Sequence, residues 1–291
     1  MWRRPCKRMN KNVLTFIGCD KEYAKADTVL FGVPFDGTAS FRPGSRFAPN
    51  AIRVDSYGLE TYSPYADRDL TEYRICDIGD LNLPFGNTDK VLEMTETTTR
   101  EILSAGKIPV MLGGEHLVTL GAIRAVHKAY PDLHIVHLDA HTDLHDEYMG
   151  EPLSHASVLH RAWDLIGDGR IHQFGIRSGE KSEFAFADAH TQMHRFSLDG
   201  FSETLKALQG KPVYFTLDLD VLDPAYMPGT GTPEPGGISF SELLSAALQL
   251  HRLQLVGCDI VELAPHYDPS GASTAVACKI VREILLQLKG A

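Results

Sequence analysis

Acidic and imidazole side chains recur at every second position in two short segments of this sequence. Asp139, His141 and Asp143 form the first group, and Asp218 and Asp220 form the second. In extended backbone, residues two apart point to the same side of the chain, so each segment would present its polar side chains together. Oxygen-rich ligation with a few imidazoles and no thiolate suits hard divalent cations, Mn²⁺ more than Zn²⁺. Both segments are therefore candidate metal-binding segments.

A third polar segment, Gly113–His116, adds His116 and brings the candidate ligands to four carboxylates and two imidazoles. Six side chains are too many for one catalytic ion that keeps a position open. They suit two ions about 3.5–4 Å apart that share bridging carboxylates and a hydroxide. Four neighbouring aspartates would repel one another strongly, and two divalent cations would offset their charge. The candidate ligands are His116, Asp139, His141, Asp143, Asp218 and Asp220.

Isolated polar residues near these segments are expected to have ordinary structural roles. A single Asp at the end of a strand usually caps a helix or a turn, and a single buried His usually belongs to a satisfied hydrogen-bond network. We assign Asp80, His127 and His137 to this group.

Short runs rich in Val, Ile and Leu alternate with longer helical patterns, and several runs are apolar on both faces, as in a parallel sheet covered by helices on both sides. The predicted strands are Thr28–Val33, Tyr73–Ile78, Ile108–Leu112, Leu133–Leu138, Arg170–Gly175, Gln192–Phe196, Val213–Leu217 and Leu255–Ile260. The predicted helices are Asp89–Ser104, Leu117–Ala129, His155–Ile166, Phe201–Leu208, Phe240–Leu250 and Thr274–Leu288. This alternation predicts an α/β protein, a three-layer α/β/α fold with a mostly parallel sheet of about eight strands.

The polar segments lie at the carboxyl ends of predicted strands. The strands that end at Leu112, Leu138, Leu217 and Ile260 are apolar along their length and turn polar directly afterwards, the last of them toward Glu262. In open parallel sheets, ligands bind at the carboxyl ends of the strands. We therefore expect the four segments to converge on one site.

Composition excludes several classes of protein. The chain has 291 residues, 43% hydrophobic and 23% charged, which is ordinary for a globular domain and atypical of disordered or fibrous chains. With 28 Lys and Arg against 38 Asp and Glu, the net charge is −10. This balance argues against nucleic-acid binding and favours cationic ligands. No apolar run reaches the ~18 residues of a membrane span, so no membrane partner is expected.

The five cysteines are dispersed without a C-x-x-C pair, which is typical of reduced thiols in a cytoplasmic protein. Cys76, Cys258 and Cys278 lie in apolar runs and are expected in the core. We expect residues 1–12 to form a loosely ordered basic tail and residues 13–291 a single catalytic domain.

The sequence resembles the ureohydrolase family, which includes arginases and agmatinases. The resemblance spans roughly residues 28–288, and the early segments Phe31–Thr38 and Arg42–Arg53 are similar to agmatinases in particular. The other matching motifs are G-G-E-H at Gly113–His116, D-A-H-T-D at Asp139–Asp143, D-L-D-V-L-D-P at Asp218–Pro224, G-T-G-T-P-E-P-G-G at Gly229–Gly237 and D-I-V-E-L-A-P at Asp259–Pro265. The resemblance implies an arginase-like fold, two Mn²⁺ per subunit held by the six candidate ligands, hydrolysis of a guanidino group to urea and an amine, and a homo-oligomer that is a trimer or a hexamer.

The resemblance also implies roles for two further residues. Glu262 matches the family's carboxylate that grips the substrate guanidinium, a charge-assisted contact that orients it. His155 matches the family's proton shuttle, and an unperturbed histidine titrates near neutrality. The family usually has Gly after this histidine, whereas Ala156 follows it here, and Leu117 replaces a common Ser after His116. A histidine at a helix N-terminus on the surface is the alternative for His155.

Substrate choice is expected to depend on the loop of residues 144–154. Arginases bind the α-carboxylate of their substrate with polar residues of this loop, but here it contains no Arg or Lys and carries Asp146, Glu147 and Glu151. Such a loop disfavours a carboxylate and favours a terminal amine, which indicates agmatine, hydrolysed to putrescine and urea. Glu180 is a further candidate for the amine. The alternative for each acid is a solvated surface charge.

Several alternative functions remain possible from the sequence alone. Guanidinobutyrase, arginase and formiminoglutamase share every metal ligand, so only loops separate them. A catalytically silent relative would be expected to lack ligands, and a metal-dependent phosphoesterase would need basic residues around the metals. The rigid loop Gly229–Gly237 is expected to shape the pocket mouth, with Phe35, Asp36 and Arg42 either lining it or serving as turn and surface residues.

Overall fold

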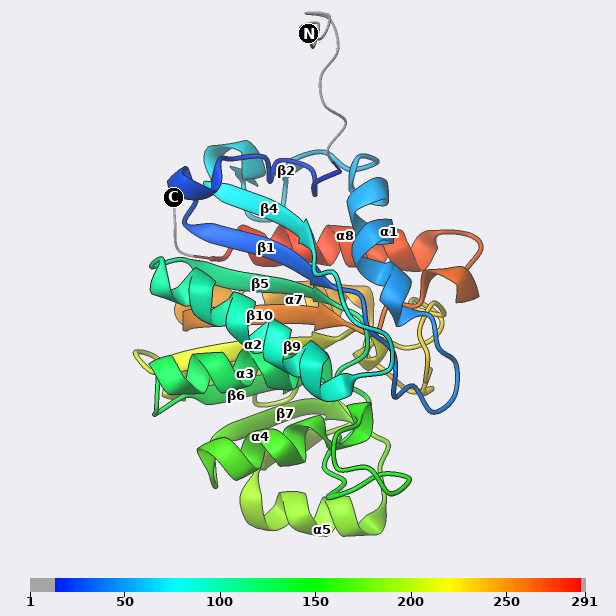
Figure 1. Ribbon diagram of the computed structural model, residues 1–291. Coiled ribbons are helices and arrows are strands. Elements are labelled where there is room, and N and C mark those ends of the chain that lie inside the picture. Colours follow the sequence, from blue (N-terminus) through cyan, green and yellow to red (C-terminus); the bar gives the residue numbers. More distant parts are fainter. Residues whose placement is uncertain (1–13, 289–291) are drawn as a thin grey trace, which may run out of the picture.

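An eight-stranded parallel sheet forms the centre of the protein in the computed structural model, which describes residues 14–288 (Figure 1). The strand order is β4-β1-β5-β10-β9-β6-β7-β8, and every neighbouring pair is parallel. The strands are β1 Thr28–Val33, β4 Ile75–Asp80, β5 Ile108–Gly113, β6 His134–Leu138, β7 Ile171–Ile176, β8 Gln192–Arg195, β9 Pro212–Asp218 and β10 Gln254–Val261. A separate small hairpin pairs β2 Tyr62–Ser63 with β3 Arg68–Asp69.

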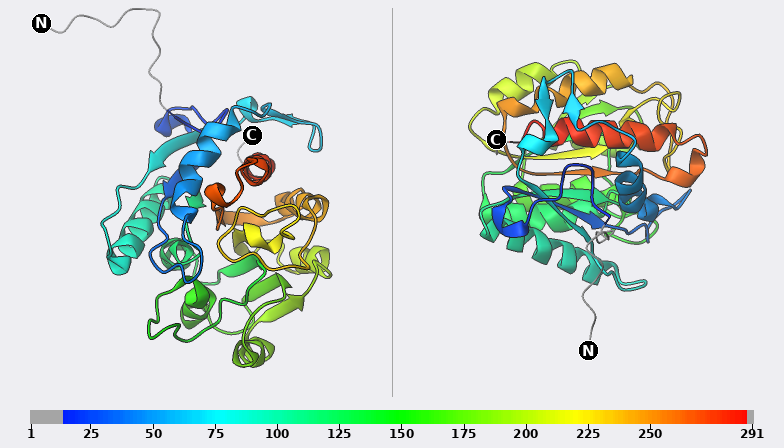
Figure 2. Two further views of the ribbon diagram at one scale, coloured as in Figure 1. Left: turned by 90° about the vertical axis from the view of Figure 1, so that its right-hand side faces the viewer. Right: turned by 90° about the horizontal axis from the view of Figure 1, so that it is seen from above.

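Helices cover both faces of this sheet (Figures 1 and 2). The helices are α1 Ala48–Ser56, α2 Thr88–Ser104, α3 Val118–Ala129, α4 Val158–Ile166, α5 Lys181–His190, α6 Phe201–Ala207, α7 Phe240–Ala247 and α8 Ala272–Leu285. Apolar residues of α2, α3, α4 and α5 join one core cluster, and those of α1, α6, α7 and α8 join the other. The predicted three-layer α/β/α fold is therefore confirmed.

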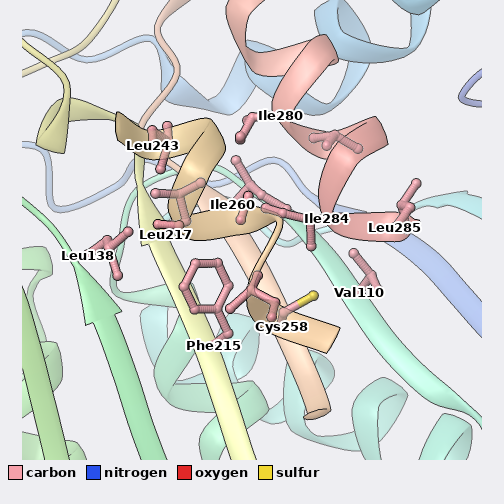
Figure 3. Packing of buried hydrophobic residues seen from close by; sticks show 14 of the residues in the cluster. Val110, Leu138, Phe215, Leu217, Leu243, Cys258, Ile260, Ile280, Ile284 and Leu285 are labelled. Atoms are coloured by element: carbon pink, nitrogen blue, oxygen red, sulfur yellow. The ribbon is translucent and has the colours of Figure 1, made fainter. Parts of the chain in front are cut away.

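Each central strand contributes to both cores because its alternate side chains point to opposite faces. In β1, Leu30 belongs to one cluster, whereas Val29 and Phe31 belong to the other. Figure 3 shows the cluster that includes residues of α8. In it, Phe215 of β9 and Ile284 of α8 lie among the apolar side chains between sheet and helix. This burial on both faces explains why the strands contain near-continuous apolar runs.

Two helices and the small hairpin have no counterpart among the predicted elements. The segment of α1 contains Pro, Asn, Val and Asp, which have weak helix propensity, and the helix is held by burial of Ile52 and Arg53. In α5 the apolar residues 184–187 are consecutive rather than three or four apart. The strands of the hairpin are only two residues long. The predicted helix from His155 begins as a 3₁₀ turn, His155–Ser157, before α4.

Three predictions concern segments away from the site. Cys76, Cys258 and Cys278 are buried and free, which confirms their assignment to the core. The predicted basic tail, residues 1–12, lies outside the described residues. Among the described residues, no helix is both long and apolar enough to cross a membrane.

A buried ion pair fastens α1 to the sheet. The Arg53 guanidinium donates to both carboxylate oxygens of Asp77, at 2.7 and 3.0 Å, and to Asp80. The side chains of Arg53 and Asp77 are 3% and 0% exposed. Asp77 also accepts a hydrogen bond from the backbone N–H of Phe16 at 2.8 Å. One carboxylate therefore joins α1, β4 and the first described segment of the chain.

Replacing Arg53 by Met is expected to lower the free energy of unfolding by about 3–5 kcal/mol, because Asp77 would remain buried without its partner. The matched control is Arg74→Met, which breaks the exposed ion pair with Asp27 and should cost less than about 1 kcal/mol. Urea unfolding of both variants measures the difference. Equal losses would contradict the assigned role of the buried pair.

Candidate active site

The four polar segments meet at the carboxyl edge of four adjacent strands. Strands β5, β10, β9 and β6 are neighbours in the sheet order, and their carboxyl ends lead into His116, Glu262, Asp220 and Asp139. The Gly-Gly turn after β5 is required by close packing, because a Cβ at Gly114 would lie 1.8 Å from the carbonyl oxygen of Phe35. The sheet order therefore brings together residues that are more than a hundred positions apart.

Three carboxylates surround the ring of His116. Its Nδ1 lies 3.0 Å from Asp139 Oδ2, 3.1 Å from Asp143 Oδ2 and 3.3 Å from Asp218 Oδ2. All four side chains are buried. One imidazole nitrogen and three carboxylate oxygens thus face a common point.

A second group of ligand atoms surrounds His141. Its Nδ1 lies 3.1 Å from Asp220 Oδ2 and 3.4 Å from Asp139 Oδ1. Asp139 therefore directs one oxygen toward His116 and the other toward His141. Asp139 could therefore contact a cation on either side.

The hydrogen bonds around His116 show that its Nδ1 is suited to a cation. The Thr216 hydroxyl donates to Asp259 at 2.6 Å, so its oxygen accepts the N–H of His116 Nε2 at 2.9 Å. The buried Nδ1 is then left with a lone pair and no hydrogen-bond partner, facing the three carboxylates. A lone pair and three anionic oxygens directed at one point are a donor set for a divalent cation, so the residues present fit such a group.

The electrostatics of the cluster also favour bound cations. Burial raises the pKa of Asp218 well above its usual value, and Asp220 and Asp139 add to the effect. Burial and the charge of Asp139 raise the pKa of Asp143 to about 7. Burial also acts to raise the pKa of Asp139. The neighbouring rings of His137, His116 and His141 have the larger, opposite effect and hold this pKa well below its usual range. Positive charge at this point therefore stabilises the carboxylates in their ionised form.

A cavity of about 330 Å³ opens beside these ligands. Its lining residues are Ser40, His116, His141, Thr142, Asp143, His145, Tyr148, His155, Ala156, Ser178, Gly179, Glu180, Glu183, Asp218, Thr232 and Glu262. Thr232 belongs to the glycine-rich loop, so this loop does reach the cavity. Phe35, Asp36 and Arg42 do not line it. Arg42 donates to the carbonyl oxygens of Thr230 and Gly231 and so anchors the loop from outside.

Glu262 lies at the cavity wall directly after β10. One of its carboxylate oxygens accepts the backbone N–H of His116 at 2.8 Å. Its backbone has φ of +65°, a strained conformation for a residue with a side chain. Burial, followed by the nearby carboxylate of Glu115, raises the pKa of Glu262 well above its usual value. A cationic ligand beside Glu262 would counter this effect.

His155 reaches the same cavity from the start of the 3₁₀ turn before α4. Its Nε2 lies 3.2 Å from the Ser40 hydroxyl, and its Nδ1 lies 3.4 Å from that of Thr38, which also accepts the backbone N–H of His155 at 3.1 Å. Burial and the positive charge of His141 lower the pKa of His155 to about 4. The ring is therefore neutral at pH 7, with hydroxyl groups beside both nitrogens.

The four acids considered for a substrate amine lie in different places. Glu180 lines the cavity at its mouth. Asp146 forms an ion pair with Arg161 and is 79% exposed, and Glu147 and Glu151 are also exposed. Of the four, Glu180 is the best placed, because the other three do not line the cavity.

The buried Glu183 is a cavity residue for which the sequence carries no signal in motif or spacing. One of its oxygens accepts the Thr142 hydroxyl and the backbone N–H of Leu144, the latter at 3.0 Å, while the other faces His145 Nε2 at 3.2 Å. Glu183 thereby holds the loop that follows Asp143. The ring of Tyr148 packs against His145 and lines the cavity as well.

The fold and the site together define a class of protein, an α/β protein with a buried carboxylate and imidazole cluster that can hold metal ions at the carboxyl edge of a parallel sheet. A model of the arginase family matches residues 26–287. An agmatinase from Bacillus subtilis (strain 168) is 49% identical over 275 residues, 93% of this chain and 95% of that protein. A guanidinobutyrase from Pseudomonas aeruginosa is 32% identical over 277 residues, 91% and 87% of the two chains.

A solved structure of a ureohydrolase is also similar to this protein. The agmatine ureohydrolase of Thermoplasma volcanium is similar with a TM-score of 0.87 and 35% identity, covering 94% of each chain. The chain belongs to the arginase family. It is accordingly an enzyme of the ureohydrolase type, which acts on C–N bonds.

Replacing Asp139 or Asp220 by Ala is expected to abolish metal binding and turnover together, because each removes an oxygen from the cluster. Loss of turnover should exceed about a hundredfold, since even outer partners of a metal site are worth 10–100-fold. Metal content after loading, measured by elemental analysis, and urea release check this. The control is Asp132→Ala on the exposed surface before β6. Near-full activity in either cluster variant would refute the ligand assignment.

Proposed function

We propose that this protein hydrolyses agmatine to putrescine and urea with two Mn²⁺ ions. The observation that carries the proposal is the charge of the cavity. Carboxylates lie at both ends, Glu262 beside the cluster and Glu180 at the mouth, and no lining residue is Lys or Arg. Agmatine is a cation at both ends, so its charges match those of the cavity.

The oxygen-rich donor set supports manganese as the metal. Four carboxylates and two imidazoles, with no thiolate, suit a hard divalent cation with a high coordination number better than Zn²⁺ in a tetrahedral site. When bound, the two ions would lower the pKa of a water molecule and so supply hydroxide at neutral pH.

The residues of the chain orient the substrate and move protons. Glu262 accepts hydrogen bonds from the guanidinium and places its carbon beside the cluster. Water adds to that carbon, and the bond from the carbon to the nitrogen that carries the aminobutyl chain then breaks. This gives urea and, once that nitrogen has gained a proton, putrescine.

The leaving nitrogen needs a proton. Because the His155 ring in the cavity wall is neutral at pH 7, it takes up a proton from solvent and passes it on to this nitrogen. The Thr38 hydroxyl donates to Glu115 and can only accept from His155 Nδ1. This leaves Nε2, beside the Ser40 hydroxyl, as the ring nitrogen that takes up the proton.

The other ureohydrolase substrates fit this cavity less well. Arginine and guanidinobutyrate each carry a carboxylate at the end that would face the mouth, where Glu180 lies. Because Glu180 is exposed, solvent screens the repulsion between two carboxylates there to about 1–4 kcal/mol at about 4 Å. The similarity to a guanidinobutyrase nevertheless makes guanidinobutyrate the informative competitor in a test.

A urea-release panel tests the proposal directly. The Mn²⁺-loaded enzyme is expected to show a kcat/KM for agmatine more than about tenfold above those for arginine and guanidinobutyrate, because of this charge mismatch. Asp139→Ala serves as the blank for each substrate. Faster urea release from arginine or guanidinobutyrate than from agmatine would overturn the proposed specificity.

The role of Glu180 has its own test. Glu180→Gln is expected to raise the KM for agmatine about tenfold with little change in kcat, because it removes the charge that faces the substrate amine. The matched control is Asp146→Asn, in the neighbouring loop but outside the cavity, which should leave KM unchanged. Butylguanidine, which has no amine, should be insensitive to Glu180→Gln. The reverse pattern would assign the amine to Asp146.

A further inference from the structure

His137 is a fully buried histidine that the proposed reaction does not use. It lies in β6, two residues before Asp139, and its ring centroid is 5.1 Å from that of His116. Its ligand-type atoms lie within 4.8 Å of those of His116 and Asp139, close enough for a metal ligand. The sequence alone favours an ordinary structural role, so its hydrogen bonds must decide between the two.

The tautomer of His137 follows from Gln173 on the neighbouring strand β7. The Gln173 amide nitrogen donates to the Thr142 carbonyl at 2.9 Å, and its oxygen accepts the Thr191 hydroxyl at 3.0 Å. Both contacts place the amide nitrogen, a donor, on the side of His137, where it lies 3.2 Å from Nδ1. The Nδ1 atom of His137 is therefore an acceptor, and its Nε2 carries the hydrogen.

The Nε2–H of His137 donates to Asp139 Oδ2 at 2.8 Å. Both ring nitrogens are thereby engaged, and neither has a lone pair free for a cation. His137 is not a ligand in this arrangement. It is the hydrogen-bond donor behind a ligand.

The two oxygens of Asp139 are held symmetrically. Oδ2 accepts the N–H of His137, and Oδ1 accepts the backbone N–H of His141 at 2.6 Å. A carboxylate oxygen has two lone pairs, so each oxygen keeps one that can face a cation. Two donors on opposite sides also prevent rotation of the carboxylate about its Cβ–Cγ bond.

We propose that His137, oriented by Gln173, is a positioning residue that holds Asp139 as the bridging ligand of both metal positions. The proposal rests on the proposed metal centre but not on the identity of the substrate. Because Asp139 faces both positions, loss of His137 should weaken both ions together rather than one of them. Gln173 extends this effect, since its contact with the Thr142 carbonyl also holds the turn between His141 and Asp143.

The experiment is a Mn²⁺ titration of the metal-free protein by calorimetry, with the melting temperature of each metal-free variant recorded in parallel. His137→Phe keeps a ring but removes the donor, and it should weaken Mn²⁺ binding about 10–100-fold at both positions. His137→Gln can place its amide nitrogen near the position of Nε2, so it should recover most of the affinity. His134→Phe, on the same strand and outside the cluster, is the matched control and should bind as the wild type does.

Gln173→Leu keeps the His137 ring but removes the amide that fixes its tautomer. It should also weaken Mn²⁺ binding, by less than His137→Phe does. This variant decides the matter if His137→Phe fails to fold. Wild-type affinity in both His137→Phe and Gln173→Leu would overturn the proposal, as would failure of folded His137→Gln to exceed His137→Phe. Metal binding is measured without substrate, so failure of agmatine hydrolysis would leave this result standing.

Discussion

Four buried carboxylates lie close together in the site, and their mutual repulsion must be offset by positive charge. Asp139, Asp143, Asp218 and Asp220 are each at most 7% exposed, and two of them have a pKa raised by burial and by their neighbours. Such a group is stable only with positive charge at its centre. The parallel sheet makes the arrangement possible because the carboxyl ends of β6 and β9 are adjacent, and helices on both faces exclude water from the strands.

Around the ligands, a second set of buried groups fixes their orientation. Asp259 and Thr216 set the tautomer of His116. In the same way, Gln173 sets the tautomer of His137, which donates to Asp139. Ligand orientation in metal sites commonly depends on such outer partners. These contacts come from four strands, β6, β7, β9 and β10, so the sheet itself orients the candidate ligands.

Much of the cavity wall, in contrast, is formed by the loops that follow the strands and by the start of α5. Glu180 and Glu183 lie at the start of α5, and Glu183 ties this helix to the loop after Asp143 through Thr142 and Leu144. A single buried carboxylate thus connects the turn that carries the candidate ligands His141 and Asp143 to the cavity wall at α5. Variation in these loops can change the substrate while the metal ligands stay in place.

The sequence by itself determined the layered fold and the eight strands of the sheet, because both depend on local periodicity. Polar residues at strand ends also indicated Asp139, His141 and Asp143 as candidate ligands. The extended backbone expected there was wrong, because β6 ends at Leu138, Asp143 has a φ of +52° and Asp220 lies in the 3₁₀ turn Leu219–Val221. It also indicated the family through motifs. Only the tertiary structure decided that Glu180 faces the cavity whereas Asp146 pairs with Arg161, that Glu183 is buried, and that His137 donates to Asp139. These outcomes depend on loop paths and on contacts between residues far apart in the chain, for which local sequence patterns carry no information.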